Sequence, residues 1–434
     1  MKILIASTSV PGHLNPLLSI ASILVGGGYE VAVQVSEDLR PTVEAAGHRF
    51  LSELPNAQTS VGYYFETYPE RMLKSPGMEM TGYDLVHFFA RNIAAQSASL
   101  KMALYDFRAD LILADSTYWG TLPMLVGSRH KCPAIAHLGI SVVNLGSGKN
   151  IPIRPDESTE QREAKQRRRE VLLLQPAQQA VNVALARLGC PSLSCPILEA
   201  MTELPDLYLH PGIESFEYPG SSSKVHYIGA LPTPAGQPSL PEWWQQFDRS
   251  KRLVLVTQGT IANRDFGQVI APALVALGGR EDVTIIVTTG GQPAESIPVA
   301  IPANAHIASF LPYAQIMTEI DLLITNGGYG TVNMAVSHGV PVISAGLTED
   351  KEEVSAHVQW SGAGIDLRTN QATPEAIKNA VDEIFTQPSY GERAQHLSLE
   401  FASHDVKAEL LSLIEKYVPE AVGANGIKIV RSQK

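Results

Sequence analysis

The chain has 434 residues, of which 33 are Lys or Arg and 44 are Asp or Glu, so its formal net charge at pH 7 is −11. This acidic balance argues against nucleic acid or an anionic membrane surface as the main partner. With 44% hydrophobic and 18% charged residues the composition is that of an ordinary globular protein. The length exceeds that of one hydrophobic core, so we expect two or three domains.

The cysteines Cys132, Cys190 and Cys195 show neither CxxC spacing nor a Cys/His grouping typical of zinc. So few thiols in a long chain favour a reducing compartment, and we expect a cytoplasmic protein. The apolar N-terminus is followed by Pro11 and Gly12, so it is too short for a signal peptide or a membrane span. No apolar run reaches the ~18–20 residues of a transmembrane helix, so we expect no membrane insertion.

The first half of the chain alternates between apolar strands and helical segments. We expect a buried strand at residues 2–7, a turn at 8–13, and a helix at 14–25 that three glycines end. Further elements follow in order: strands at 30–35, 112–114, 132–137, 205–210 and 225–229, and a long helical stretch at 84–107. This alternation indicates a mostly parallel sheet covered on both faces.

The middle of the chain is less regular. Residues 154–170 are rich in charge, which allows a basic site but is more typical of a solvated helix face, and we expect the latter. Residues 231–250 begin with a stretch rich in Pro, Gly and Ser, which is typical of a linker. We therefore expect an N-terminal domain at 1–230, the linker at 231–250, a C-terminal domain at 251–415, and a tail at 416–434.

The alternation restarts after this linker. The expected strands are 252–256, 284–287 and 306–308, and the expected helices are 269–277, 374–385 and 394–417. The pattern therefore indicates a second doubly wound domain, with a cleft between the two.

The most informative stretch is residues 320–357. A buried strand at 322–325 runs into the turn Asn326-Gly327-Gly328-Tyr329-Gly330, then a helix opened by Thr331 and a strand at 340–345. Glycines at such a turn let the backbone approach a ligand, and free N–H groups at the helix start favour an anion, most simply a diphosphate. The glycines could equally form only a tight turn, and both interpretations stay open.

This strand-turn-helix-strand unit resembles the nucleotide-sugar signature of family 1 glycosyltransferases, which include bacterial macrolide and natural-product enzymes. Four other segments resemble the family in the expected order: Gly12-His13-Leu14-Asn15-Pro16, Ala109 to Asp115, Gln258-Gly259-Thr260, and Phe310-Leu311-Pro312-Tyr313. The resemblance implies the GT-B fold. This is an α/β architecture of two Rossmann-like, doubly wound domains facing across a cleft, with a C-terminal helix crossing back to the first domain.

The resemblance implies that His13 is the general base and that Asp115 orients it. His13 lies at a strand-to-helix turn, and Asp115 ends another strand on the same sheet edge. There the carboxylate could hold the second ring nitrogen, as in catalytic dyads. The alternatives are a structural or capping role for His13 and a helix N-cap at Asp115.

The resemblance also implies the residues that contact the nucleotide sugar: Gly12, Gln258, Gly259, Thr260, Phe310, Leu311, Asn326, Gly327, Gly328, Gly330, Thr331, Asp350 and Lys351. Thr260 would bind the β-phosphate, Phe310 would stack on the base, and Asp350 with Lys351 would bind sugar hydroxyls. The alternatives are an ST-turn with capping glycines, a core phenylalanine, and a solvated acidic loop at 349–353.

Two residues depart from the family pattern. Asn326 stands where the family often has a His that contacts the diphosphate, and Asn can donate to a phosphate oxygen but cannot become cationic. Lys351 replaces a Gln, so it could reach a sugar hydroxyl, pair with a carboxylate, or suit a different donor. Both changes leave the fold prediction intact and the sugar identity open.

The implied reaction is an inverting, metal-independent transfer of a hexose from a UDP-sugar or dTDP-sugar to a hydroxyl of a small, partly apolar acceptor. We expect no permanently bound cofactor and no metal, since no acidic DxD pair stands in a suitable place. The acceptor pocket is expected near aromatic and apolar segments: Tyr63-Tyr64-Phe65, Phe88-Phe89, Tyr118-Trp119 and residues 138–143. The protein would be a monomer or a homodimer.

Two alternatives share this fold: a nucleotide-sugar 2-epimerase and a non-catalytic helper of a partner transferase. An epimerase needs further acid and base groups near the sugar, and His357 is the only candidate we find after Asp350. A helper would be free to lose His13 and Asp115, yet both are present. A nicotinamide site is disfavoured because no GxGxxG follows the first strand.

Overall fold

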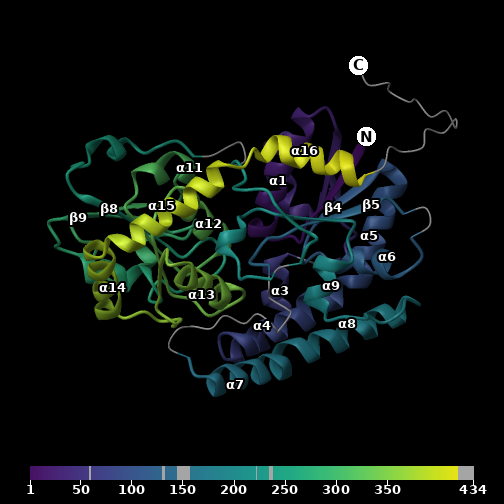
Figure 1. The fold of residues 1–434 in the computed structure, drawn as a ribbon, viewed down its shortest axis with the longest axis horizontal. Helices are drawn as coiled ribbons and strands as arrows, with labels where there is room; N and C mark the ends of the chain where they lie inside the picture. The colour runs from purple at the N-terminus through teal and green to yellow at the C-terminus, as the bar shows by residue number, and fades with distance from the viewer. Residues whose placement is uncertain (58–59, 130–131, 144–156, 221, 234–237, 419–434) are drawn as a thin grey trace.

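The computed structural model describes residues 1–434 except 58–59, 130–131, 144–156, 221, 234–237 and 419–434 (Figure 1). The described residues form two parallel sheets flanked by helices, which confirms the predicted fold class. Residues 419–434 of the predicted tail at 416–434, and residues 154–156 of the charged stretch at 154–170, lie outside this description.

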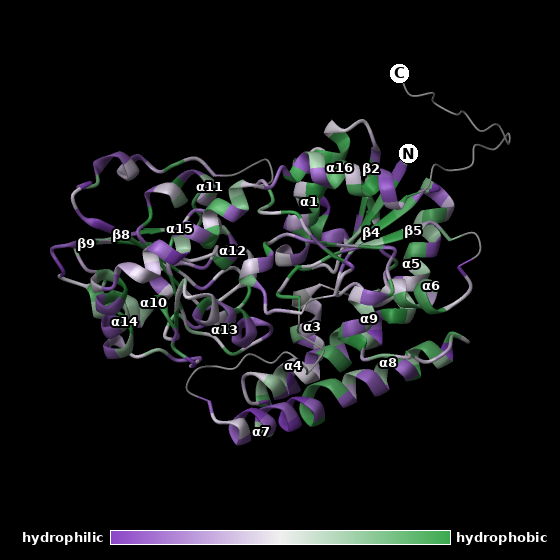
Figure 2. Ribbon diagram, viewed as in Figure 1, coloured by the Kyte–Doolittle hydropathy of each residue, from purple (hydrophilic) through white to green (hydrophobic). Residues whose placement is uncertain are grey.

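The first sheet has seven strands in the order β3-β2-β1-β4-β5-β6-β7. Their bounds are β1 Lys2–Ala6, β2 Glu30–Val35, β3 Arg49–Ser52, β4 Leu111–Asp115, β5 Ala134–Leu138, β6 Leu207–His210 and β7 Val225–Tyr227. All of β4 is buried, because helices cover both faces of the central strands and only apolar runs suit such positions (Figure 2). The order reverses at β1 and β4, whose carboxyl ends therefore flank a crevice.

The second sheet has six strands in the order β10-β9-β8-β11-β12-β13. Their bounds are β8 Arg252–Thr257, β9 Val283–Thr288, β10 Ala305–Ala308, β11 Leu322–Thr325, β12 Val342–Ser344 and β13 Gly364–Asp366. Here the order reverses between β8 and β11, so this sheet also has a crevice at its carboxyl edge.

The α-helices pack around these sheets. Those before the second sheet are α1 Pro11–Gly26, α2 Arg40–Ala45, α3 Val61–Thr67, α4 Met78–Asp84, α5 Arg91–Phe107, α6 Leu122–Val126, α7 Thr159–Arg169, α8 Gln175–Arg187 and α9 Ile197–Glu203. Those after it begins are α10 Ile270–Leu277, α11 Tyr313–Ile316, α12 Tyr329–Ser337, α13 Lys351–Ser361, α14 Pro374–Thr386, α15 Pro388–Ala402 and α16 Val406–Tyr417.

Three predicted helices differ in the structure. The first begins at Pro11, because proline is favoured in the first turn, and this places His13 inside the helix start. The stretch at 84–107 is divided by a π-helical segment, Leu85–Ala90, between α4 and α5. The stretch at 394–417 is two helices, and the Asp405 side chain accepts the Ala408 N–H to open the second one.

Helix α16 crosses back to the first domain, as predicted (Figure 1). Its buried Leu410 and Ile414 pack in the same core as Ile3 and Leu14. The predicted domain limits stay a prediction. Within the predicted linker, Trp244 is buried and packs into the core of the second domain.

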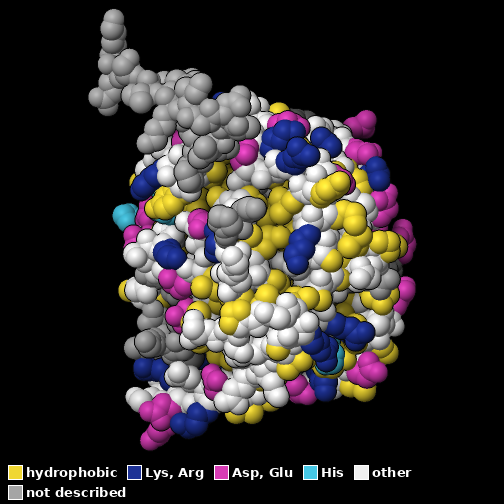
Figure 3. Space-filling model, turned by 90° about the vertical axis from the view of Figure 1, so that its right-hand side faces the viewer, with side chains coloured by type: hydrophobic (Ala, Val, Ile, Leu, Met, Phe, Trp, Pro, Cys, Tyr) yellow, Lys and Arg dark blue, Asp and Glu magenta, His cyan; other side chains and the backbone are white. Residues whose placement is uncertain are grey.

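One end of the molecule, the face shown in Figure 3, carries acidic and basic side chains scattered among hydrophobic ones. The basic side chains on this face do not form one continuous patch. None of the helices in the described residues combines the length and the apolar character that crossing a bilayer demands.

Candidate active site

His13 lies in the first turn of α1, directly after the carboxyl end of β1. Its backbone N–H donates to the Val10 carbonyl, which fixes the turn. The side chain is 17% exposed and lines a cavity of about 890 Å³ between the two domains. An imidazole packed into a core would be closed to a substrate, so this position leaves His13 accessible for chemistry.

Asp115 ends β4, the strand beside β1, and its side chain is fully buried. Its Oδ1 lies 3.3 Å from His13 Nδ1, and its Oδ2 accepts the Thr8 N–H at 2.6 Å. Burial alone would raise the pKa of Asp115, but the hydrogen bonds from His13, Thr117 and Thr8 lower it below its ordinary value. The carboxylate is therefore ionised at neutral pH. It caps no α-helix, since α6 begins only at Leu122.

Thr117 completes this cluster and was not predicted from the sequence. Its hydroxyl donates to Asp115 Oδ1 at 2.6 Å and lies 3.0 Å from His13 Nδ1. A carboxylate only accepts hydrogen bonds, so Nδ1 carries a proton, and in the neutral form of the ring Nε2 is the nitrogen with the lone pair. A hydroxyl two residues after the strand-ending aspartate was the available signal, but only the turn geometry shows where it points.

Nearly every residue predicted to contact the nucleotide sugar lines the same cavity; the exception is Gly327. Asp115 lies behind His13 rather than at the cavity surface. The structure therefore brings the predicted residues of both domains to one cavity. The role of each residue stays a prediction.

The glycine turn opens α12 at the cavity wall. Gly327 has φ +87°, and a Cβ there would lie 2.7 Å from Ser355 Oγ, so the backbone needs glycine. A Cβ on Gly328 or Gly330 would meet nothing within 4 Å. Since Gly328 and Gly330 line the cavity, the N–H groups of this helix start are accessible to a ligand there, and such groups favour an anion.

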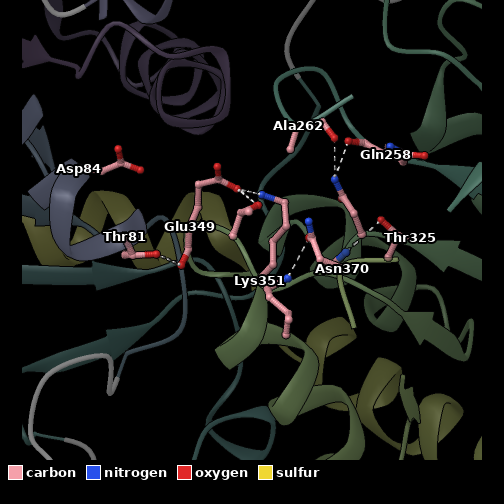
Figure 4. Close-up of polar contacts among 12 residues, drawn as sticks. Thr81, Asp84, Gln258, Ala262, Thr325, Glu349, Lys351 and Asn370 are labelled. Carbon is pink, nitrogen blue, oxygen red and sulfur yellow. Dashed lines mark hydrogen bonds and ion pairs between the residues drawn. The ribbon is translucent and has the colours of Figure 1, made fainter. Parts of the chain in front are cut away.

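The Asn326 side chain makes its hydrogen bonds within the protein. Its Nδ2 donates to the Gln258 carbonyl at 2.7 Å and to the Ala262 carbonyl at 3.4 Å. Both amide hydrogens therefore have carbonyl partners within the protein, and a contact between Asn326 and the diphosphate stays a prediction. The side chain ties the turn after β11 to the turn after β8 (Figure 4).

The Gln258 side chain is also occupied within the protein. Its Nε2 donates to the Asp265 carbonyl, and its Oε1 accepts the N–H groups of Val269 and Ile270 at the start of α10. The next two residues remain open, since Gly259 has φ +68° with no atom near an added Cβ and Thr260 is exposed at the cavity.

Phe310 is 52% exposed and lines the cavity, so the alternative of a core phenylalanine is wrong. An added Cβ on Gly291 would lie 3.0 Å from the Phe310 ring, which shows that the ring rests on that turn. Leu311 is buried in the second core and also contributes to the cavity lining. This arrangement offers a flat aromatic face with backbone beside it.

Asp350 and Lys351 lie at the start of α13 and line the cavity. Lys351 is 8% exposed and pairs with Glu349 (Figure 4). Glu349 also pairs with Arg71 of the first domain. Burial would raise the pKa of Glu349, but Lys351, Thr348 and Arg71 lower it to about 2. The alternative of a freely solvated acidic loop is therefore wrong.

The expected solvated helix face at 154–170 is wrong in part for the same reason. Lys165 and Arg169 of α7 pair with Glu352 and Glu353 of α13, each at 2.9 Å. Arg169 is only 5% exposed. These pairs join the two domains, and the sequence could not show that the partners lie more than 180 residues away.

Part of the aromatic wall that was predicted to face an acceptor lines the cavity. Tyr64, Phe65, Phe88 and Phe89 line the cavity on the side of the first domain, as do Ile140 and Ser141 from the predicted segment 138–143. The rings of Tyr64 and Phe88 lie 4.8 Å apart. The other predicted aromatics are elsewhere: Tyr118 and Trp119 are fully buried in the core, and Tyr63 does not contribute to the lining.

Among the described residues, no group of three or more His, Cys, Asp or Glu is arranged to hold a metal ion. Metal independence stays a prediction, because the arrangement of these side chains does not test a metal carried in by a substrate.

Comparison with known families gives one match within the second half. Residues 273–416 match the family model described as Erythromycin biosynthesis protein CIII-like, C-terminal domain.

Two curated relatives align along the whole chain. The 4'-demethylrebeccamycin synthase of Lentzea aerocolonigenes is 32% identical over 430 residues, which cover 96% of this chain and 99% of that protein. The UDP-glycosyltransferase 2 of Phaeomoniella chlamydospora is 32% identical over 434 residues, which cover 95% of each protein.

Among solved structures, Spinosyn Rhamnosyltransferase SpnG aligns with a TM-score of 0.69 at 19% identity, covering 96% of this chain and 100% of that one. At this identity the likeness shows a shared fold. The same enzyme is also solved in complexes with thymidine diphosphate and with spinosyn aglycone.

Proposed function

Because the chain belongs to the family 1 glycosyltransferases, nucleotide-sugar-dependent enzymes of the GT-B fold, we propose that it transfers a hexose, with inversion, to a hydroxyl of a small natural product. The donor would be a UDP-sugar or a dTDP-sugar. One observation carries this proposal. The cluster of His13, Asp115 and Thr117 shares a single cavity with the open glycine turn of the other domain.

In the proposed reaction, His13 Nε2 takes the proton of the acceptor hydroxyl as its oxygen attacks the anomeric carbon. The bond from that carbon to the diphosphate oxygen breaks on the opposite face, so the configuration inverts. The ionised Asp115 stabilises the imidazolium that forms, as the carboxylate does in catalytic triads.

The departing diphosphate would be stabilised by the N–H groups at the start of α12 and by Thr260. These groups are fixed before the reaction, since Asn326 ties the two turns together. This supports a transfer that requires no divalent metal. Phe310 would stack on the uracil or thymine, and Asp350 would bind sugar hydroxyls.

The acceptor would be a phenolic, polyketide or other partly apolar molecule. The wall beside His13 is built from Val10, Tyr64, Phe65 and Phe88, which suit a flat or ring-shaped apolar surface. The names of the relatives, a rebeccamycin-type synthase and a spinosyn rhamnosyltransferase, support this class of acceptor.

A thermal-shift panel of UDP-sugars and dTDP-sugars tests the donor, since a ligand that binds only the native state raises the unfolding temperature. We expect one nucleotide series to stabilise the protein. Mass spectrometry should then show one added hexose on aromatic or polyketide alcohols, and NMR should show an inverted anomeric centre.

Two controls separate this activity from its rivals. Incubation with donor alone should leave the sugar unchanged, whereas a 2-epimerase would alter it. Retention of anomeric configuration, or the absence of both nucleotide binding and transfer, would contradict the proposal.

A further inference from the structure

The loop that holds Asp350 and Lys351 is anchored by the opposite domain. Glu349 Oε1 accepts from Arg71 Nη2 at 3.1 Å, while the other carboxylate oxygen pairs with Lys351 Nζ and accepts from Thr348. The Glu349 carbonyl accepts the Thr81 hydroxyl at 3.1 Å (Figure 4). Arg71 and Thr81 belong to the first domain, 278 and 268 residues earlier in the chain.

Arg71 is itself held rigidly. It is 6% exposed, and its guanidinium makes a two-pronged contact with Asp84, with Nε to Oδ1 at 2.7 Å and Nη2 to Oδ2 at 2.9 Å. Asp84 ends α4 and also accepts the Tyr64 hydroxyl at 2.6 Å. Such a fork fixes the direction of the guanidinium, which a lysine would not do.

These hydrogen bonds and ion pairs form one continuous network across the cleft. It runs from Tyr64 on the aromatic wall through Asp84 and Arg71 to Glu349 and Lys351. Both of its ends line the cavity. The geometry of the loop at 349–351 therefore depends on a side chain from the domain that carries the aromatic wall.

In this network each positive charge pairs with a negative one. Lys351 faces Glu349, and Arg71 lies between Asp84 and Glu349. The Lys351 ammonium therefore pairs with a carboxylate of its own loop, which favours a role for Lys351 in fixing the loop. Because this charge is already paired, the site favours an uncharged hexose as the sugar of the donor.

Resting on the proposed glycosyl transfer, we propose that Arg71 is a positioning residue for the donor sugar. Through Glu349 it holds the loop at 349–351 in the conformation that places Asp350 and Lys351 against the sugar. The nucleotide and diphosphate would contact other elements, namely Phe310, Thr260 and the start of α12. Arg71 should therefore affect recognition of the sugar and leave recognition of the nucleotide unchanged.

The test compares two ligands in the full-length protein: UDP or dTDP alone, by calorimetry, and the matching nucleotide sugar, by donor KM in the transfer assay. In Arg71→Met the donor KM should rise about tenfold, as for a coupled contact, while the Kd of the bare nucleotide stays within about twofold of wild type. Glu349→Gln should give the same pattern, and the double variant should be no worse than either single variant.

Arg169→Met is the matched control. Arg169 is equally buried, lines the same cavity and pairs across the domains, but with Glu353 inside α13 rather than with the loop. Arg169→Met should not raise the donor KM more than it raises the Kd of the bare nucleotide. Glu349→Gln leaves the pairing of Arg71 with Asp84 in place, so it tests the same link if Arg71→Met fails to fold.

Two results would overturn this inference. One is a donor KM in Arg71→Met and Glu349→Gln that stays within about twofold of wild type. The other is an equal loss of bare nucleotide and nucleotide sugar. A wild-type protein that neither binds nucleotide nor transfers sugar would instead overturn the proposed function itself, and this inference with it.

Discussion

At the scale of single residues, His137 lies on β5 beside the strand that carries Asp115, and it is fully buried. Its Nδ1 donates to the Met201 carbonyl at 2.7 Å, and its Nε2 lies 3.1 Å from the Thr121 hydroxyl. This arrangement suits the neutral ring. Burial lowers the pKa of His137 to about 4 from its usual value of 6.5.

This shift predicts a loss of stability in mild acid. Between pH 6.5 and pH 4 His137 binds a proton in the unfolded chain but stays neutral in the folded protein. The free energy of unfolding therefore falls as the pH falls. From pH 7.5 to pH 5 this group should account for about 2 kcal/mol. Urea titrations of wild type and His137→Asn at both pH values measure it.

The variant should be less stable at pH 7.5 but should lose less stability on acidification. An equal loss in both proteins would show that His137 does not control the acid response.

Single residues also show what the sequence could not provide. Hydroxyl, amide and guanidinium groups take their roles from partners distant in the chain. Asn326 could be placed at the turn by its motif, but its occupied amide depends on carbonyls in another turn. Arg71 had no signal in the sequence, because its partner Glu349 is 278 residues away.

At the scale of elements, the glycine turn at the start of α12 combines two different requirements. Gly327 is required by the backbone, since φ is +87° and a side chain would meet Ser355. Gly328 has ordinary backbone angles, φ −63° and ψ 129°, and open space around an added Cβ. The fold therefore needs the first glycine, whereas the second leaves room at the cavity wall.

A pair of alanine substitutions separates these requirements. Gly327→Ala should lower the free energy of unfolding by roughly 1–3 kcal/mol through backbone strain and the contact with Ser355. Gly328→Ala should change the free energy of unfolding by less than about 0.5 kcal/mol. It should weaken the binding of UDP or dTDP, because the new methyl group occupies space that the diphosphate would need. Denaturant unfolding and calorimetry measure the two effects.

If Gly328→Ala bound the nucleotide as well as wild type does, the diphosphate would not rest on this turn. If Gly327→Ala were as stable as Gly328→Ala, the strain assigned to the turn would be wrong.

Most strands could be predicted because parallel strands buried on both faces are continuous apolar runs. The strand predicted at 322–325 agrees with β11, and that at 30–35 agrees with β2. Helix ends were harder. No residue type marks the π-helical segment Leu85–Ala90, so the sequence pattern did not show where it interrupts the helix. The separation of α15 from α16 depends on the packing of the two helices against different domains.

At the scale of the whole molecule, the two domains are joined by α16 and by charged contacts across the cleft. The acidic residues at 349–353 meet Arg71, Lys165 and Arg169 of the first domain. From the sequence alone the stretch at 154–170 was expected to be solvated, and a solvated loop was the alternative for 349–353, because a run of charges carries no information about an opposing run on another domain. This arrangement places His13 on the same cavity as the glycine turn that opens α12, which a single domain could not do.

The central claim is that His13 removes the proton of the acceptor while the second domain holds the nucleotide. The direct measurement is the turnover of His13→Ala, with a donor and acceptor pair that wild type uses, together with the calorimetric Kd for the bare nucleotide. Turnover should fall at least about 100-fold, with the Kd within about twofold of wild type. Near-full turnover of a hydroxyl acceptor by His13→Ala would contradict the account.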